Sequence, residues 1–393
     1  MDSVKNLLTA EEVLKDVYLP YWNNQIGIKP SPFIAKIKKV TVASDNIVAG
    51  APIGISGGFG YSSEGLGTPA AGHALNKRFT AHTKDMYVNL CISQKAVELG
   101  TTKGAMKDQL AQEVESAYDA ANWNVGRSAF GNGKGILTNV TALSTPGNIV
   151  TVSDVKNLKE GITVDFYETG ALVGSTPALT RRIIAIDREN NKIVIDGAKT
   201  TVSAGFITIQ KSYGKEITGV GSIFDDSITE LYGVNKADNL FLKPIVETAN
   251  NDIRDGVITK ALRRSSRDKN GNVDMILCGD KAYDAYTTYL RESNIRIEDR
   301  TGTVEGGFKS IQFMFGNRLV DIVNESFIPD SEMWGVDTSA FELHQTGWKF
   351  SNLRDAGIFN LMENQSVYRA LLYNYAELIC KNPGSCIKIT NVA

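Results

Sequence analysis

The clearest hydrophobic pattern in the chain is a strand followed by a long helix. From Asp85 to Ser93, apolar residues alternate with more polar ones, which is typical of a half-buried β-strand. From Thr102 to Ala129, apolar residues recur every three or four positions, which predicts a helix with one buried face. At ~1.5 Å per residue this helix would be roughly 40 Å long. Its apolar stripe consists of Met106, Leu110, Val114, Ala117, Ala121 and Val125.

Elsewhere, helix and strand signals alternate without the regular βαβ order of a parallel sheet, which indicates an α+β fold. Leu240 to Arg264 predicts a helix with one apolar stripe and a basic end. Pro32 to Val42 mixes lysines with branched apolar residues and predicts an extended arm or edge strand. Further strands are predicted at Asp274–Cys278, Ile311–Phe315, Arg318–Val323, Met333–Val336, Gln365–Ile379 and Cys386–Asn391, and a helix from Asp280 to Leu290.

The amino-acid composition of the chain changes between about residues 140 and 210. This segment is rich in Val, Ile and Thr and is interrupted by turn signals. Within it, Ile183 to Asp196 predicts a hairpin around Asn190 and Asn191. We expect a small all-β insertion of roughly 70 residues, for which a barrel is one possible form.

A glycine-rich run precedes the first clear strand. Seven glycines lie between Gly54 and Gly72, and the segment from Gly50 to about His82 has low hydrophobicity. Such a segment cannot bury enough surface to fold alone. At roughly 30 residues it also exceeds the usual ~12–15 residue limit for loops. We interpret it as a long arm that needs a neighbour, which is typical of an assembly subunit.

Composition narrows the class of protein without identifying it. The chain has 393 residues, 42% hydrophobic and 22% charged, which is ordinary for a soluble globular protein. Its net charge of −2 gives no overall electrostatic attraction for nucleic acid. No apolar run reaches the ~18 residues that a membrane helix needs.

Residues that could carry catalysis or bind metal are sparse. The three histidines, His73, His82 and His344, are widely separated, and two of them lie in the glycine-rich arm. The four cysteines, Cys91, Cys278, Cys380 and Cys386, form no CxxC pair, so a zinc or redox motif is not expected. Cys380 and Cys386 flank a turn and could face each other, although reduced thiols are favoured in a cytoplasm. We therefore predict no catalytic, cofactor or metal site.

Several short segments resemble functional motifs only superficially. Asp268–Asn272 lacks the spacing of a calcium loop and predicts a turn. Gly131–Gly135 fails the phosphate-loop spacing and predicts a helix stop. Asp225–Asp226 predicts a solvated turn. The basic pairs Lys77–Arg78 and Arg181–Arg182 predict exposed charges that could meet acidic patches on neighbouring subunits.

The order of these parts resembles that of a tailed-phage major capsid protein of the HK97 fold. An arm, a long extended loop, a strand, a long helix and a mixed domain follow one another in the same sequence, and the resemblance covers nearly the whole chain except the insertion. The stretches that carry it are Val17–Pro20, Ala70–Gly72, Asn124–Arg127, Phe130–Leu137, Ile217–Asp225 and Leu231–Val234.

The resemblance implies a division of the chain into named parts. These are an N-terminal arm (1–45), an extended loop called the E-loop (46–84), a P-domain strand and spine helix (85–134), an A-domain (135–362) with the all-β insertion (141–212), and C-terminal P-domain strands (363–393).

The function implied is that of a capsid protein that self-assembles into pentamers and hexamers of an icosahedral bacteriophage head. The head would enclose double-stranded DNA without sequence-specific binding, and the protein would be located in the virion after assembly in the bacterial cytoplasm. Implied partners are neighbouring subunits, a separate scaffolding protein, a portal and a maturation protease, with no membrane. Any DNA contact would come from local basic residues such as Lys36, Lys38 and Lys39.

Two alternatives remain open at this point. An encapsulin, a cellular nanocompartment shell protein, shares the fold. A hydrolase with a flexible glycine-rich lid would instead need titratable groups gathered in one pocket. Some relatives also cross-link a loop lysine to an asparagine of a neighbour. Lys77, Asn374 and Asn382 lie in suitable regions, but no motif fixes that chemistry, so we do not expect a cross-link.

Overall fold

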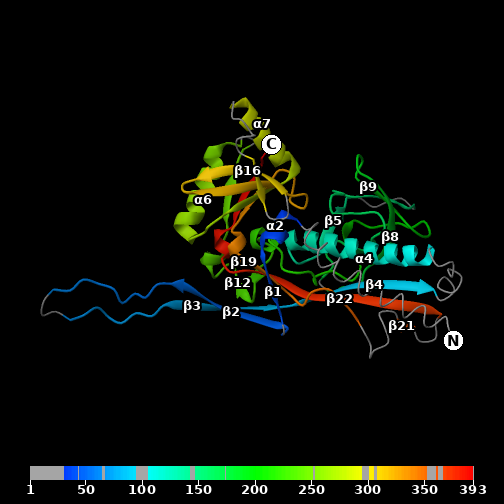
Figure 1. Ribbon diagram of the computed structural model, residues 1–393, viewed down its shortest axis with the longest axis horizontal. Coiled ribbons are helices and arrows are strands. Elements are labelled where there is room, and N and C mark those ends of the chain that lie inside the picture. The colour runs from blue at the N-terminus through cyan, green and yellow to red at the C-terminus, as the bar shows by residue number, and fades with distance from the viewer. Residues whose placement is uncertain are drawn as a thin grey trace.

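The structure is a computed structural model that describes residues 31–42, 44–63, 67–93, 105–141, 147–172, 174–250, 253–293, 301–304, 308–351, 360–361 and 366–392. Most of the expected N-terminal arm, including Val17–Pro20, lies outside these residues. Figure 1 shows a body made of three sheets, with a long hairpin that projects to one side.

The central sheet is built on one long strand. β22 (Val367–Cys380) pairs along ten residues with β4 (Lys84–Ser93), as the alternating pattern predicted. Its other edge pairs with three shorter strands, and β1 forms the outer edge. These are β19 (Phe341–Gln345), β20 (Lys349–Phe350), β21 (Asn360–Leu361) and β1 (Lys38–Thr41).

The long helix packs on this sheet. α4 spans Ala105–Phe130, close to the prediction. Val114, Ala117 and Tyr118 are buried against Leu90 and Leu372, and Ala121 is buried one turn further on. The predicted apolar face is therefore confirmed from Val114 onwards. The side chains of Met106 and Leu110 lie outside the described residues.

A seven-stranded sheet forms the second layer, in the order β13-β23-β18-β14-β17-β16-β15. Its helices α6 (Asp255–Lys269) and α7 (Asp280–Glu292) pack on one face through Ile258, Leu262 and Tyr286, and the other face joins the central core. The strands are β13 (Ile245–Thr248), β14 (Met275–Cys278), β15 (Thr301–Val304), β16 (Phe308–Phe315), β17 (Arg318–Asn324), β18 (Met333–Val336) and β23 (Ile387–Thr390).

Two sequence expectations need correction in this layer. The predicted helix Leu240–Arg264 is a short 3-10 turn η1 (Leu240–Leu242), then β13, and α6 begins only at Asp255. Ile245 fits a helical stripe, but pairing of β13 with β23 uses it in a sheet. The expected C-terminal unit 363–393 is also divided, because β22 lies in the central sheet whereas β23 lies between β13 and β18.

The third sheet closes on itself. Its order is β5-β10-β7-β8-β9-β6, and an antiparallel bridge between Val140 and Val152 joins the two outer strands, so the insertion is a small barrel. The barrel has a core of its own that includes Val150, Ile183 and Ile207. Its strands are β5 (Ile136–Val140), β6 (Ile149–Thr151), β7 (Thr163–Glu168), β8 (Leu179–Asp187), β9 (Lys192–Ile195) and β10 (Gly205–Ile209).

The predicted hairpin of the insertion is confirmed as β8 and β9, with Asn191 in the left-handed conformation. β5 pairs with β10 although it precedes the expected start of the insertion at residue 141. This ladder brings the two ends of the insertion together, as a domain inserted into another requires. Lys156 holds the barrel to the body by donating to the Ile328 carbonyl (2.7 Å) and pairing with Asp330.

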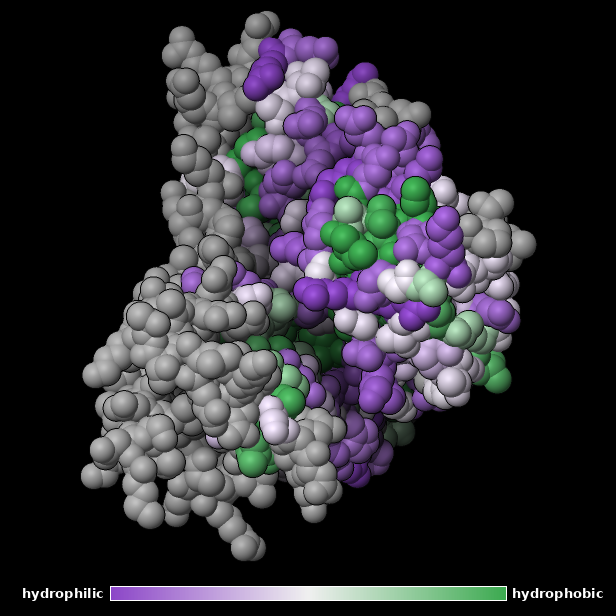
Figure 2. All heavy atoms as spheres, turned by 90° about the vertical axis from the view of Figure 1, so that its right-hand side faces the viewer, coloured by the Kyte–Doolittle hydropathy of each residue, from purple (hydrophilic) through white to green (hydrophobic). Residues whose placement is uncertain are grey.

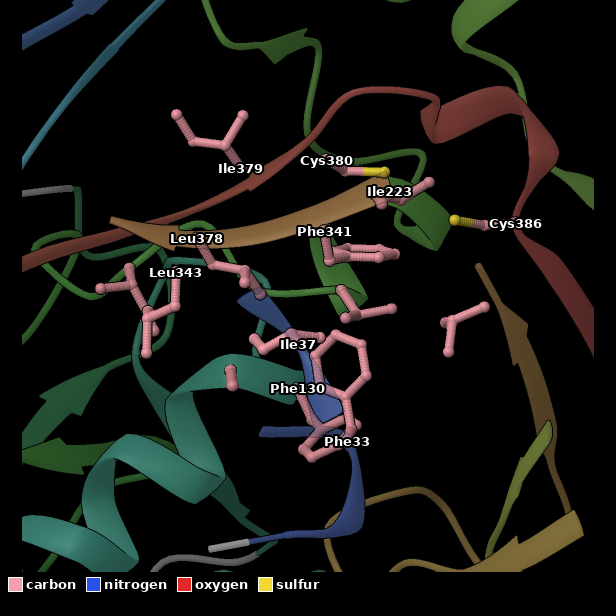
Figure 3. Packing of buried hydrophobic residues seen from close by; sticks show 14 of the residues in the cluster. Phe33, Ile37, Phe130, Ile223, Phe341, Leu343, Leu378, Ile379, Cys380 and Cys386 are labelled. Atoms are coloured by element: carbon pink, nitrogen blue, oxygen red, sulfur yellow. The ribbon is translucent and has the colours of Figure 1, made fainter. Parts of the chain in front are cut away.

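The expected extended arm at Pro32–Val42 is in part a helix. Ser31 caps the five-residue α2 (Pro32–Lys36) by accepting from the Ile34 amide at 3.2 Å, and β1 follows as an edge strand. Phe33 is fully buried, with its ring 5.6 Å from that of Phe130 and 5.1 Å from that of Phe341. Figure 3 shows these rings together beneath the central sheet. Burial of one aromatic anchor here overrides the extended pattern.

Two carboxyl groups are buried in the joints between layers. Glu377 of β22 accepts from the Thr218 amide (2.7 Å), and Glu325 follows β17. Each has one oxygen without a hydrogen-bond partner. Burial raises the pKa of both groups to about 7. Both therefore hold a proton in the folded protein at pH values where an unfolded chain has lost it.

We predict that burial of Val114 is essential to the packing of α4. Val114→Asp places an unpaired carboxylate between helix and sheet, at a cost on the order of several kcal/mol. Far-UV circular dichroism and solubility should show misfolded or insoluble protein. Ser116→Asp adds the same carboxylate on the exposed face of the helix and is the matched control. Soluble, fully folded Val114→Asp protein would contradict the assigned face.

We predict that the two buried carboxyls make the protein less stable as pH rises. Between the unfolded pKa of 4.5 and the folded pKa of about 7, the folded state binds more protons, so the free energy of unfolding falls with pH. We expect Glu325→Gln or Glu377→Gln to remove that group's own share of the loss of stability, which is on the order of 3 kcal/mol above pH 7. Urea unfolding at pH 5 and pH 8 measures the difference. The exposed Glu230→Gln is the control, and equal pH dependence in all variants would refute the assignment.

Candidate assembly surface

The most unusual surface of the molecule is its projecting hairpin. The segment from Gly50 to about His82, expected as a long arm, is a hairpin whose two strands, β2 (Asn46–Gly54) and β3 (Leu75–His82), form a ladder that ends where the glycine-rich run begins. Small and polar residues hide its period-two pattern in the sequence. Figure 1 shows that the hairpin leaves the body near β12 (Val234–Asn235) and extends well beyond it.

The base of the hairpin is anchored in the core. Ala81 is buried, and Ile47 and Phe79 pack against the central core. The Thr80 amide donates to the Tyr232 carbonyl at 2.9 Å. The hydroxyl of Tyr232 in turn donates to the Leu378 carbonyl and accepts from the Cys380 amide, each at 3.0 Å. Tyr232 therefore connects the hairpin directly to β22.

Tyr232 adopts a strained conformation in this position, with φ of 50°. A bulky residue in this left-handed region is uncommon and is kept only where surrounding contacts compensate. Here the backbone bond to Thr80 and the two bonds to β22 supply that compensation. The hairpin therefore leaves the body in a fixed direction.

A polar cluster closes the base on its exposed side. Thr83 donates its hydroxyl to Asp45 (2.7 Å), and a ring nitrogen of His82 lies 3.3 Å from the same carboxylate. Hydrogen bonds from Thr83 and His82 hold the pKa of Asp45 below its usual range. His82 therefore takes part in the turn into β4 through its contact with Asp45.

Glycine allows close backbone approach beyond the ladder. A Cβ atom at Gly58 would lie 2.9 Å from the amide nitrogen of Gly72, and one at Gly60 would lie 2.9 Å from the ring of Pro69. Larger residues at these positions would force the two sides of the hairpin apart. The glycines thus allow the hairpin to be narrow.

Large apolar side chains on the outer half of the hairpin are exposed to water. Ile55 is 92% exposed, Phe59 80% and Tyr61 95%. The rings of Phe59 and Tyr61 are 5.3 Å apart and contact each other edge-on. A soluble monomer rarely exposes such a group of residues, and apolar patches of this kind mark interaction sites. We identify Ile55, Phe59 and Tyr61 as the hairpin patch.

Most of the other sequence candidates are structural. Asp268 pairs with Arg267 at the end of α6, and Asn270 ends that helix in the left-handed conformation, so the predicted turn is confirmed. His344 lies 3.3 Å from Glu342 in β19. Among the described residues, no group of three His, Cys, Asp or Glu side chains could hold a metal ion.

The structure brings together two segments that the sequence analysis treated separately. Asn132, in the glycine loop after α4, donates to Asp225 at 2.8 Å, and the ammonium group of Lys134 donates to Ser227 at 2.8 Å. Burial acts to raise the pKa of Asp225, but hydrogen bonds from Ser227 and Asn132 outweigh it and hold that pKa low. The glycine loop is thus a helix stop that is tied to the Asp225 turn.

The remaining candidates are buried or engaged. Cys380 and Cys386 are free buried thiols in the central core (Figure 3), and burial with a hydrogen bond to Cys386 raises the pKa of Cys380. Asn374 is buried in β22, and Asn382 donates to the Lys269 carbonyl at 3.0 Å. In this subunit, therefore, neither asparagine side chain is exposed and unbonded, as a cross-link to a neighbour would require. In the described part of the chain, no helix is both long and apolar enough to span a membrane.

Comparisons with known proteins give structural matches only. No family model matches the chain, and no curated protein matches its sequence. The capsid of cyanophage A-1(L) matches with a TM-score of 0.57 and 10% identity, covering 92% of each chain. The capsid of a native GTA particle matches at 0.49, with 9% identity over 92% of this chain and 90% of that one. An encapsulin from Synechococcus elongatus matches at 0.47, with 7% identity over 93% and 88%.

The match to the cyanophage capsid extends over nearly the full length of both chains, so it concerns the whole architecture rather than one layer. The parts seen here, a projecting hairpin, a long strand, a long helix on a sheet and a mixed second layer, follow the order that the resemblance in the sequence implied. The chain has the α+β HK97-like capsid fold.

Proposed function

We propose that this chain is a major capsid protein that self-assembles into pentamers and hexamers of an icosahedral bacteriophage head. The observation that carries the proposal is the exposed hairpin patch, on a hairpin that is anchored in the core at its base and whose described outer residues join no buried cluster. The capsid fold supports the same role. The proposed role is structural rather than catalytic, and its location is the virion.

The physical basis of assembly in this proposal is burial of the hairpin patch on a neighbouring subunit. Removing apolar surface from water is worth roughly 25 cal/mol per Å², and aromatic side chains bury most per residue. Phe59 and Tyr61 are largely exposed to water in the single subunit. Most of their burial energy is therefore released only when a neighbouring subunit covers them. The ladder below them restricts where the hairpin patch can contact a neighbouring subunit, and this favours one arrangement of subunits.

In this proposal the hairpin is the E-loop (46–84), and β4 with α4 forms the P-domain strand and spine helix (85–134). The seven-stranded sheet forms the centre of the A-domain, and the barrel is its insertion. Residues 1–45 act as the N-terminal arm. A separate scaffolding protein, a portal and a maturation protease complete the set of proposed partners.

We predict that the double variant Phe59→Ser, Tyr61→Ser folds but does not assemble. Both side chains are exposed in the subunit, so their loss costs the isolated fold little, while the neighbour loses its apolar contact. Size-exclusion chromatography and negative-stain electron microscopy would show subunits in place of capsomers and shells. Circular dichroism checks that the fold is retained.

The matched control is Leu172→Ser, which removes a large side chain that is 76% exposed on the barrel. It should assemble normally. Shells from the double variant that are equal in yield and size to those of the parent would refute the hairpin patch as the assembly contact. Failure of the parent itself to form shells, with or without a scaffold, would refute the capsid proposal.

We also predict weak, salt-sensitive binding to free duplex DNA. The net charge is −2, and two of the expected DNA contacts are engaged: Lys36 pairs with Asp274 (2.9 Å) and Lys38 with Glu342 (3.4 Å). Each remaining phosphate contact releases a counterion, so affinity should fall steeply with added salt. A gel-shift titration measures this. Tight, sequence-selective binding at physiological salt would contradict enclosure of DNA without sequence reading.

A further inference from the structure

The barrel contains a cavity that neither its core nor its attachment to the body explains. The cavity has a volume of about 280 Å³ and lies between β7, the start of β8, the loop 174–177 and the segment 210–215. Its volume is just below the ~300–1,000 Å³ typical of small-molecule sites. A ligand that fills it is therefore about the size of one six-membered ring with substituents.

A buried carboxylate lines this cavity. Asp165 is only 1% exposed, and it accepts from the Thr180 hydroxyl (2.6 Å) and from the Lys211 amide (2.7 Å). Both of these donors are neutral, so neither offsets the charge of the carboxylate. A carboxylate offers about four lone-pair positions, so capacity to accept further hydrogen bonds remains.

The backbone beside Asp165 is strained. Lys211 has φ of 60°, although it is neither glycine nor asparagine. A hydrogen bond from its backbone amide to Asp165 holds this conformation, and Lys211 is among the residues that line the cavity. Backbone strain of this kind in a cavity lining is a reason to look for a binding role there.

The polar lining selects a ligand class by charge and by hydrogen bonding. Asp165 disfavours an anion, while Lys211 and Lys215 disfavour a cation. The same groups offer an acceptor and donors, and Thr176 adds a hydroxyl that can do either. A neutral ligand with several hydroxyl groups satisfies both requirements, because each hydroxyl donates and accepts. The rings of Tyr167 and Tyr213, 4.9 Å apart, supply an apolar wall.

We propose that this cavity of the barrel is a binding site for a neutral saccharide ring. The site belongs to the barrel alone and does not depend on whether the chain builds a shell. On a shell, many identical barrels would convert a weak single-site affinity into strong attachment to a polysaccharide surface.

The test is saturation-transfer NMR on the full-length protein with methyl glycosides of glucose, galactose and N-acetylglucosamine. At least one should bind. Asp165→Asn removes the carboxylate charge and should weaken binding at least tenfold. Because Asp165 also bonds to Thr180 and to the Lys211 amide, Thr176→Trp provides a second variant that fills the cavity from an exposed position. Lys199→Met, on the barrel surface away from the cavity lining, should bind as the parent does.

A parallel titration with dextran separates two sources of the ring. Binding of both dextran and a methyl glycoside supports a site for surface polysaccharide, and binding of a methyl glycoside alone supports a site for a soluble sugar. No binding of any probe overturns the proposal. So does binding that Thr176→Trp leaves unchanged. Neither result bears on shell formation, which electron microscopy reports separately.

Discussion

The arrangement of the three sheets depends on how tightly backbone can pack against the last turn of α4. A Cβ atom at Gly219 would lie 2.5 Å from the carbonyl oxygens of Ser128 and Gly131, and one at Gly221 would lie 2.5 Å from that of Phe130. The Val220 amide donates to the Ala129 carbonyl at 2.8 Å. Only a glycine-flanked segment can come this close, so the chain that returns from the barrel satisfies the helix end directly with its own backbone.

Other contacts gather around the same helix end. Arg127, one turn earlier, forms a buried pair with Glu216. The ring of Phe130 lies 6.3 Å from Trp334 of the seven-stranded sheet and 6.1 Å from Phe327. Because α4 also lies on the central sheet, its end is the point where barrel, central sheet and second layer meet. A shift of the helix there would disturb all three, which explains why so many buried aromatic residues are placed at this joint.

Most of the fold could be predicted where a single period governs a segment. The alternation from Asp85 to Ser93 and the stripe of α4 are of this kind, because each buries one face against one layer. Prediction failed where an apolar residue has a role set by distant partners. Phe33 is buried by Phe130 and Phe341, which lie far away in sequence, and Ile245 pairs with Ile387 near the C-terminus. No local pattern contains that information.

The candidate surface shows the same limit. Glycine content and low hydrophobicity marked the segment from Gly50 to about His82 as an arm that needs a neighbour, but the sequence showed neither the ladder of β2 and β3 nor its anchor at Tyr232. That anchor depends on a strained backbone and on bonds to β22, at positions remote in sequence. The barrel cavity could not be predicted from the sequence either, because Asp165 and Lys211 are 46 positions apart and form no motif.

The barrel and the hairpin illustrate two different ways of adding to one fold. The barrel has its own core and joins the body at paired strand ends and at Lys156, so its outer surface is free to vary without disturbing α4. Among its described residues beyond the base, the hairpin joins no buried cluster, and Ile55, Phe59 and Tyr61 stay exposed. The barrel and the hairpin therefore depend on different residues and on different sources of stability, so a change in one need not disturb the other.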